Sequence, residues 1–311
     1  MKRGICVRLF DLHCDTLYEC WKRKIPLDVN DLHIDLERGR RYDAWAQVFA
    51  VWMPDTVRGE AAWRQCESIL DLAVSQTEQY AGKMRLVHSG EEIDRALTAG
   101  CCAAVLAVEG GSALAGRLEH IQALAQRGVK ILTLTWNGEN ELGYGSGCGE
   151  SSGLKPFGRE AVLELKRWGI VPDVSHLNER GFWDIAELTE GVFIASHSVS
   201  AALCDHPRNL KDEQFALIRD RGGLVGLNLC GSQLGEQSFE QLERHFYHYL
   251  SLGGERTVAF GCDFDGTDLP PEWGGIQVME RLYDFLCRKN YDAVCLDRLF
   301  FSNSNDFFHR L

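Results

Sequence analysis

Hydrophobic residues along the chain gather into short runs, and most of the stretches between the runs are polar, glycine-rich or helical in character. Short apolar runs bounded by turn residues are typical of parallel strands that are buried on both faces. Eight such runs occur, at residues 9–17, 44–53, 101–111, 129–137, 170–174, 192–195, 223–229 and 257–266. Strands that alternate with helices predict an α/β fold, a (β/α)8 TIM-type barrel.

Three of the intervening segments have clear helical character, at residues 59–79, 155–168 and 239–252. In the last of these, His245 and His248 are expected at the surface. Because barrels of this type run from about 200 to over 400 residues as one unit, residues 1–311 are interpreted as a single domain. A composition of 45% hydrophobic and 25% charged residues is that of a globular protein with a large core.

Charge and cysteine content exclude several classes of protein. A net charge of −12 without any basic run argues against nucleic-acid binding. In residues 1–17, Arg8 and Asp11 interrupt the apolar core that a signal peptide requires, and no long uncharged apolar stretch suggests a membrane span or anchor. The 12 cysteines include no C-x-x-C pair, so reduced thiols in a cytoplasmic protein are expected.

Residues that commonly bind metals recur where the runs end. The carboxyl ends of barrel strands collect catalytic groups, so these side chains should converge. Imidazole and carboxylate without thiolate suit hydrolytic zinc, and five ligands that include one bridging carboxylate suffice for two ions. Strand alternation turns Cys14 and Cys262 to the opposite face and places Asp11 on the same face as the first two candidates. The candidates are His13, Asp15, Glu109, His176, His197 and Asp263.

Each candidate also has an ordinary explanation. A single histidine is more often structural than a ligand, and Glu109 could cap the helix that follows it. A carboxylate directly after a buried run must nevertheless be paired, hydrogen-bonded or bound to metal. Arg208 lies in a polar loop, where most arginines are simply solvated. Repetition of the pattern at several strand ends favours the metal site.

Six motifs carry a resemblance to a known family. They are DLHCDTL, AVEGG, LTLTWN, PDVSHL, ASHS followed by HPRNL, and GCDFDG. In this order and approximate spacing, they resemble the membrane dipeptidase (renal dipeptidase-like) family of the amidohydrolase superfamily. The resemblance covers nearly the whole chain. It implies a zinc-dependent dipeptidase that hydrolyses dipeptides with a metal-activated hydroxide.

The resemblance also implies residue roles. His13 and Asp15 would bind one zinc ion and His176 and His197 the other, with Glu109 bridging the two.

Arg208 matches the arginine that holds the dipeptide carboxylate, and Asp263 matches the catalytic acid/base. Asp265 is interpreted as a supporting group, although the reverse assignment of the two aspartates stays open. Trp136 replaces a histidine found in many members, and we expect Trp136 and Asn137 to contribute to substrate binding.

Two other functions stay open on the sequence alone. Another metal-dependent amide hydrolase, acting on N-acyl amino acids, is favoured if the glycine-rich loop after Trp136 closes off the site for the dipeptide amino group. A non-catalytic binding protein with the same fold is the second, and it is disfavoured by the intact ligand set. The tryptophan-rich helices could form an interface between subunits, so a homo-oligomer stays a possible assembly.

Overall fold

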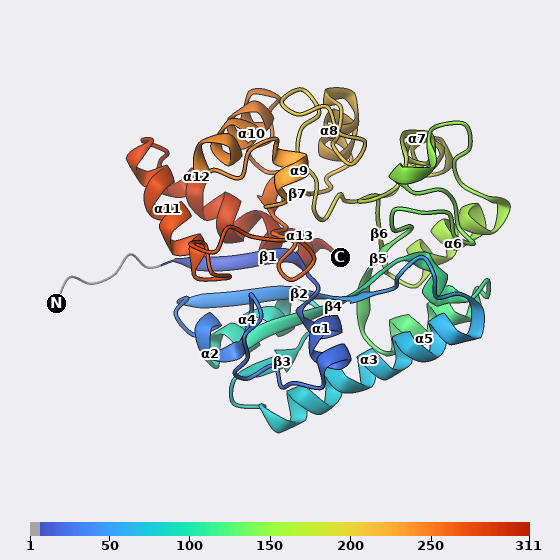
Figure 1. Ribbon diagram of the computed structural model, residues 1–311, viewed down its shortest axis with the longest axis horizontal. Coiled ribbons are helices and arrows are strands. Elements are labelled where there is room, and N and C mark those ends of the chain that lie inside the picture. The colour runs from blue at the N-terminus through green and yellow to red at the C-terminus, as the bar shows by residue number, and fades with distance from the viewer. Residues whose placement is uncertain (1–6) are drawn as a thin grey trace.

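In the computed structural model, which describes residues 7–311, the strands form a parallel ring with helices outside it (Figure 1). Neighbouring strands follow the order β6-β5-β4-β2-β1-β8-β7, and every strand pair is parallel. Two single bridges, Asp173 to Ile194 and Ala195 to Val225, insert the run at 192–195 between β6 and β7 and complete the ring. The α/β-barrel prediction is therefore confirmed.

The strands differ widely in length. β1, β2 and β4 are long, whereas the others are short, and β3 is a small addition that pairs with the first residues of β4. The predicted strand at 192–195 is present only as the two bridges, and several predicted strands end earlier than the apolar pattern suggested. The strands are β1 Arg8–Cys14, β2 Ala44–Trp52, β3 Met84–Leu86, β4 Cys102–Glu109, β5 Val129–Thr133, β6 Val171–Asp173, β7 Val225–Leu227 and β8 Val258–Phe260.

The helices surround the ring and close one of its ends. The helix predicted at 59–79 is confirmed as α3, and those predicted at 155–168 and 239–252 are confirmed as α6 and α10 with ends that differ by one residue. A π-helical turn at Arg298–Ser302 joins the last two helices. The helices are α1 Thr16–Arg23, α2 Leu36–Gly39, α3 Gly59–Gln79, α4 Gly90–Thr98, α5 Glu119–Gln126, α6 Pro156–Arg167, α7 Glu179–Leu188, α8 Asp212–Asp220, α9 Gly231–Leu234, α10 Phe239–Ser251, α11 Val278–Arg288, α12 Ala293–Asp297 and α13 Asn303–Arg310.

Two buried apolar clusters lie on the two faces of the sheet. The larger cluster packs strand residues against the surrounding helices. The smaller fills the barrel interior, and α4 and α13 close it at the amino ends of the strands, where Phe308 stacks on Phe10 with 5.2 Å between ring centres. Its strand residues include Phe10, Leu12, Ala46, Val48, Ala103, Val105, Ala107 and Ile131. The opposite end of the barrel is left for polar side chains.

One histidine prediction is wrong. His245 is fully buried, because α10 turns it toward the loops rather than toward solvent. Its Nδ1 accepts from the backbone N–H of Ser200 at 3.2 Å, and its Nε2 lies 3.2 Å from the backbone oxygen of Leu234. Burial lowers the pKa of His245. His248 is half-buried beside Asp212, with 2.8 Å between Nε2 and Oδ1.

Among residues 7–311, none of the helices has both the length and the apolar character that crossing a membrane requires. The prediction that residues 1–17 lack a signal peptide falls partly on residues 1–6, which lie outside the described residues.

Candidate metal centre

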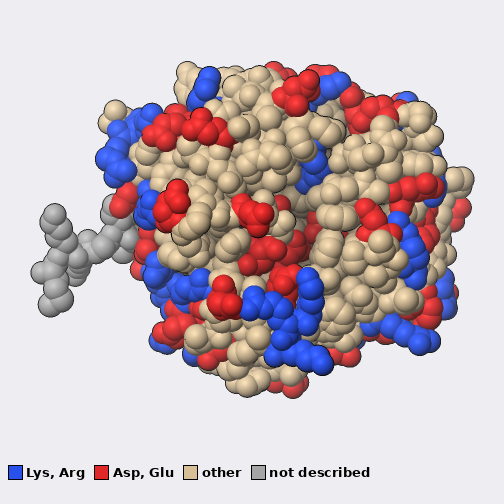
Figure 2. Space-filling view, in the orientation of Figure 1, with Lys and Arg blue, Asp and Glu red and all other residues tan. Residues whose placement is uncertain are grey.

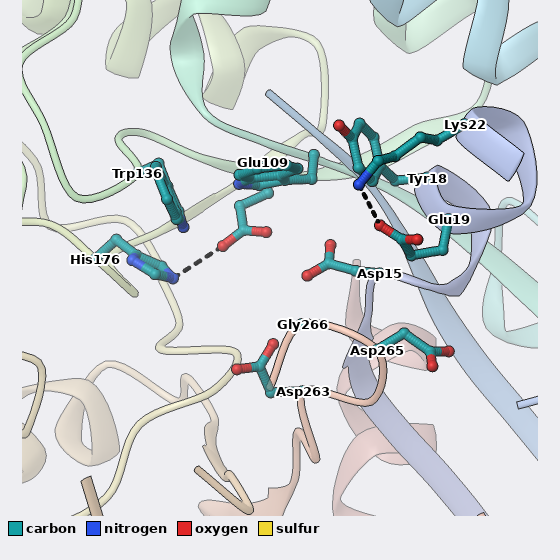
Figure 3. A pocket seen from close by; sticks show the side chains of 11 residues that line it. Asp15, Tyr18, Glu19, Lys22, Glu109, Trp136, His176, Asp263, Asp265 and Gly266 are labelled. Atoms are coloured by element: carbon teal, nitrogen blue, oxygen red, sulfur yellow. Dashed lines mark hydrogen bonds and ion pairs between the residues drawn. The ribbon is translucent and has the colours of Figure 1, made fainter. Parts of the chain in front are cut away.

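A cavity of about 270 Å³ opens at the carboxyl ends of the strands (Figure 3). Acidic side chains gather in a hollow near the middle of the face shown in Figure 2. The side chains that line the cavity come from segments far apart in the sequence and include Asp15, Glu109, Trp136, His176, Asp263 and Asp265. The convergence expected from the strand ends is therefore present.

Glu109 lies at the centre of the site. It is the last residue of β4 and is 2% exposed. Its Oε1 is 2.9 Å from His176 Nε2 and 3.5 Å from His197 Nε2, whereas its Oε2 is 3.3 Å from His13 Nε2. The two oxygens of one carboxylate thus face different histidines.

His13 connects Glu109 to two further carboxylates. His13 Nε2 lies 3.9 Å from Asp15 Oδ1 and 3.8 Å from Asp263 Oδ1. Two overlapping sets of side chains could each hold a metal ion, because their potential ligand atoms all lie within 4.8 Å of one another. One set is His13, Glu109 and His197, and the other is His13, Asp15 and Asp263.

The site fits positive ions. Four of its buried polar atoms have no hydrogen-bond partner within residues 7–311: His13 Nε2, Asp15 Oδ1, Glu109 Oε2 and His197 Nε2. Leaving such atoms unpaired is costly in a protein interior. Imidazole nitrogens and carboxylate oxygens are common ligands of divalent zinc. Coordination to metal ions would satisfy all four atoms.

The shifted pKa values of the cluster also indicate a site for positive ions. Burial and the nearby Glu109 charge raise the pKa of Asp15 well above its usual value. Burial also raises the pKa of Asp263, to about 7. Although burial lowers the pKa of His13, the carboxylates of Glu109, Asp15 and Asp263 raise it to about 10. The carboxylates of the cluster therefore lack enough positive charge nearby to balance them.

A bulge in β1 brings His13 into the site. Asp11 pairs with Gln47 and Cys14 pairs with Phe49, so three steps along β1 match two along β2. The bulge leaves Leu12 in the interior cluster, and His13 also points inward, to Glu109. Asp11 does not share a face with His13, and that prediction is wrong because regular alternation fails at a bulge.

Asp11 instead fixes the neighbouring backbone. Its Oδ2 accepts from Gln47 Nε2 and its Oδ1 accepts from the backbone N–H of Cys262, both at 2.6 Å. Cys14 and Cys262 are buried in the outer cluster, in agreement with their predicted direction.

Three residues of the site have left-handed backbone conformations, with φ of 69° at His176, 62° at Asp263 and 66° at Asp265. Non-glycine residues rarely adopt this conformation, and such positions often occur at functional sites. Because β8 ends at Phe260, strand alternation does not apply to the two aspartates. Asp265 points away from Asp263 in Figure 3.

The side chain of Asp265 is held by hydrogen bonds from Thr16 and His33, near the start of the chain. It accepts from Thr16 Oγ1 at 2.5 Å and from the backbone N–H of His33 at 2.6 Å. In return, the Asp265 backbone N–H donates to His33 Nδ1 at 2.9 Å. These contacts fix the loop that carries Asp263.

The predicted substrate-binding residues lie around the cluster. Arg208 is 7% exposed and donates through Nη2 to the backbone oxygen of His197 at 3.3 Å, while its Nε has no partner in the described chain. Trp136 lines the cavity and packs edge-on against Trp52, with ring centres 5.0 Å apart. Asn137 Oδ1 lies 2.8 Å from His176 Nδ1, so its side-chain oxygen contacts a candidate ligand.

One part of the cavity lining was not predicted from the sequence. Tyr18, Glu19 and Lys22 of α1 line it, and the Lys22 ammonium lies 3.2 Å from Glu19 Oε1 (Figure 3). These residues follow Asp15 by three, four and seven positions, which is the spacing of one helical face. That spacing after a candidate ligand is the signal that could have revealed them.

The fold and the site define a metal-dependent hydrolase of the α/β-barrel class. A family model described as membrane dipeptidase, peptidase family M19, matches residues 5–306. The chain therefore belongs to the membrane dipeptidase family and is a metallo-dipeptidase, a hydrolase that acts on dipeptides. Family membership favours an enzyme over a non-catalytic binding protein.

Solved structures agree with this assignment. The chain is similar to a crystal structure described as dipeptidase AC, a metallopeptidase of family M19, with a TM-score of 0.91, 27% identity and 98% of both chains covered. It is equally similar in fold to a metallopeptidase from Rhodobacter sphaeroides bound to a phosphinate mimic of the dipeptide L-Ala-D-Ala. That match has a TM-score of 0.91 and 25% identity and covers 98% of this chain and 99% of the other.

Curated relatives include an uncharacterized protein in the pqqA 5′ region of Klebsiella pneumoniae. It is 34% identical over 236 residues, which is 72% of this chain and 87% of that protein. The dipeptidase tcpJ of Claviceps purpurea is 27% identical over 250 residues, which is 75% of this chain and 58% of that protein.

Proposed function

We propose that this metallo-dipeptidase uses two zinc ions that share Glu109. The observation that carries the proposal is the position of the Glu109 oxygens, one near His176 and His197 and the other near His13. His13 and Asp15 would hold one ion, and His176 and His197 would hold the other. Two zinc ions bound in this way supply a water of lowered pKa and polarise the scissile carbonyl.

Asp263 is proposed as the group that moves the proton. Its carboxylate lies at the cavity wall, 3.8 Å from His13 Nε2, so Asp263 Oδ1 is close to the metal ligands. From there it can take a proton from the attacking water and give it to the leaving amine. Asp265 would act as a positioning residue, because its side chain is already engaged by Thr16 and His33.

Arg208 is proposed to bind the free carboxylate of the dipeptide. A guanidinium can clamp a carboxylate with two parallel hydrogen bonds. Arg208 is buried, and one of its nitrogens has no partner among the described residues. Trp136 would form an apolar wall for the substrate. Asn137 would position His176, because its oxygen accepts the His176 Nδ1 proton.

Metal analysis tests the number of ions. Purified protein reconstituted with zinc and desalted should contain two ions per chain, and a reproducible ratio near one would overturn the binuclear proposal.

A substrate screen with the same zinc-loaded protein tests the chemistry. It should include L-X-L-Y dipeptides, L-X-D-Y dipeptides and N-acyl amino acids, since a relative of similar fold was solved with a mimic of L-Ala-D-Ala. Cleavage confined to N-acyl amino acids would assign the site to the other class of amide hydrolase.

A further inference from the structure

The two ring nitrogens of His197 face different surroundings. Nε2 faces Glu109 Oε1 at 3.5 Å and has no hydrogen-bond partner within the described chain. Nδ1 lies 2.8 Å from Ser196 Oγ, and Ser196 Oγ lies 2.6 Å from Asp173 Oδ2. All three side chains are almost completely buried, so a buried carboxylate is linked to a candidate metal ligand through one hydroxyl.

Asp173 is surrounded by donors. Its Oδ1 accepts from the backbone N–H groups of Ser175 at 3.0 Å and Ser196 at 2.9 Å. Its Oδ2 accepts from Thr133 Oγ1 and from Ser196 Oγ, both at 2.6 Å. The Asp173 carboxylate is thus the acceptor in all four of these contacts.

These contacts determine where the protons lie. Ser196 has one hydroxyl proton, and it is given to Asp173. The Ser196 oxygen must therefore accept from His197, so the proton of the neutral imidazole is on Nδ1 and the lone pair is on Nε2. The Ser175 hydroxyl, 3.3 Å from Ser196 Oγ, can occupy the second lone pair of that oxygen without changing this result.

We propose that Asp173 and Ser196 are positioning residues for His197. They hold the imidazole in the tautomer that leaves the Nε2 lone pair free for the proposed zinc ion, on the side of the ring where Glu109 lies. The part of this inference that concerns zinc rests on the proposed function, whereas the tautomer can be measured without metal. Groups that fix metal-bound histidines in this way commonly change metal affinity by about 10- to 100-fold when they are removed.

Two substitutions separate this role from simple packing. Ser196→Ala removes the acceptor, so His197 is free to adopt either tautomer. Asp173→Asn should do more harm, because the two backbone N–H groups keep the amide oxygen at the Oδ1 position and place the NH2 group beside Ser196 Oγ. Ser196 would then accept from this introduced amide and donate to His197 Nδ1, which forces the proton onto Nε2.

The experiment measures tautomer and zinc affinity in parallel. Long-range ¹H–¹⁵N spectra of metal-free, histidine-labelled protein, assigned with a His197→Gln variant, report which nitrogen carries the proton. Zinc titration against a competing chelator reports affinity. Ser200→Ala is the matched control, because Ser200 is fully buried in the same segment and, within residues 7–311, its hydroxyl accepts only from the backbone N–H of Ala202. Thermal unfolding of the metal-free proteins checks that each variant folds.

The wild type should show the Nδ1–H tautomer, Ser196→Ala a mixture, and Asp173→Asn the Nε2–H tautomer. Zinc affinity should fall about 10- to 100-fold in Ser196→Ala, and about a further tenfold in Asp173→Asn. The double variant should return to the affinity of Ser196→Ala, because the amide can no longer act through Ser196. Ser196→Thr, which keeps the hydroxyl, should restore the Nδ1–H tautomer.

An Nε2–H tautomer in the wild type, or additive losses in the double variant, would overturn the inference. If Asp173→Asn does not fold, the wild-type and Ser196→Ala spectra still decide it. A wild-type Nδ1–H tautomer in a protein that binds only one ion would leave the positioning role intact and reject the binuclear proposal.

Discussion

The strands of the two halves of the barrel differ in length (Figure 1), and the two halves hold their site residues by different means. In one half, β1, β2 and β4 have seven to nine residues, and Glu109 lies in register with Trp52 and Thr133 on the adjoining strands. In the other, β6, β7 and β8 have three residues each, and 192–195 makes only single bridges. Backbone pairing positions the central carboxylate, whereas the histidines of the short half lie beyond their strands.

In the half with short strands, side-chain hydrogen bonds replace backbone pairing in positioning the site residues. Asp173 joins three consecutive strand ends through Thr133, Ser175 and Ser196. Asn137 contacts His176 in the same half. The long strands therefore determine where the site lies, and buried polar side chains determine the orientation of the site residues in the half with short strands.

Replacement of Glu109 with Gln tests the long half most severely. We expect both proposed ions to be lost or weakened, because one carboxylate serves both. Loss of metal-ion catalysis worth several kcal/mol would lower kcat/KM by about 1,000-fold or more. The measurement is zinc content together with dipeptide hydrolysis. Glu119→Gln, on the exposed first turn of α5, should behave like the wild type. A larger loss from His13→Ala would argue against a shared carboxylate.

Asp11→Ala tests the seam between β1 and β8. The change leaves the backbone N–H of Cys262 without its acceptor, and it leaves the Gln47 amide nitrogen with only the Val48 backbone oxygen, 3.3 Å away. We expect the free energy of unfolding to fall by about 2–4 kcal/mol, because each unpaired buried donor costs about 1–3 kcal/mol. Urea denaturation of metal-free protein measures it. Asp43→Ala, an exposed site, serves as the control. An unchanged denaturation midpoint would mean that the strand ladder alone holds this seam.

Arg208→Lys tests a loop of the short half. A lysine keeps the charge but cannot make the bidentate contact, so KM for dipeptides should rise about 10-fold while both ions stay bound. Steady-state kinetics and metal analysis of the same preparation measure the two effects. Hydrolysis of dipeptide amides, which lack the free carboxylate, tests whether Arg208 recognises that group. If the wild type cleaves amides as well as free acids, Arg208 does not recognise the carboxylate.

Trp136 lies just beyond β5, between the two halves, and its replacement should have the smallest effect. Trp136→Ala removes aromatic surface beside Trp52 and should lower kcat/KM by about 3- to 10-fold, mainly for dipeptides with a bulky first residue. Trp136→His should be tolerated. The measurement is kcat/KM for the three proteins on a small and a bulky dipeptide. Equal values would restrict Trp136 to packing.

The sequence by itself determined the barrel and most of its candidate ligands. Strands buried on both faces must be apolar throughout, so they can be recognised without any knowledge of their partners. Helix α3 was predicted with its correct ends because its apolar positions recur regularly over 21 residues, a pattern that can also be recognised without knowledge of its partners. The ligand candidates could be identified because parallel strands bring their carboxyl ends to one side of the barrel.

Tertiary structure decided what depends on contacts between distant residues. The bulge that turns His13 inward is defined only by the pairing of β1 with β2. The burial of His245 depends on Ser200 and on the loop at Leu234. Asp173 lies within the apolar run at 170–174 and was not a candidate residue. Its link to His197 exists only because the 192–197 segment folds beside β6. A local pattern can show that a residue is apolar or polar, but the partner of a buried polar group is set by the fold.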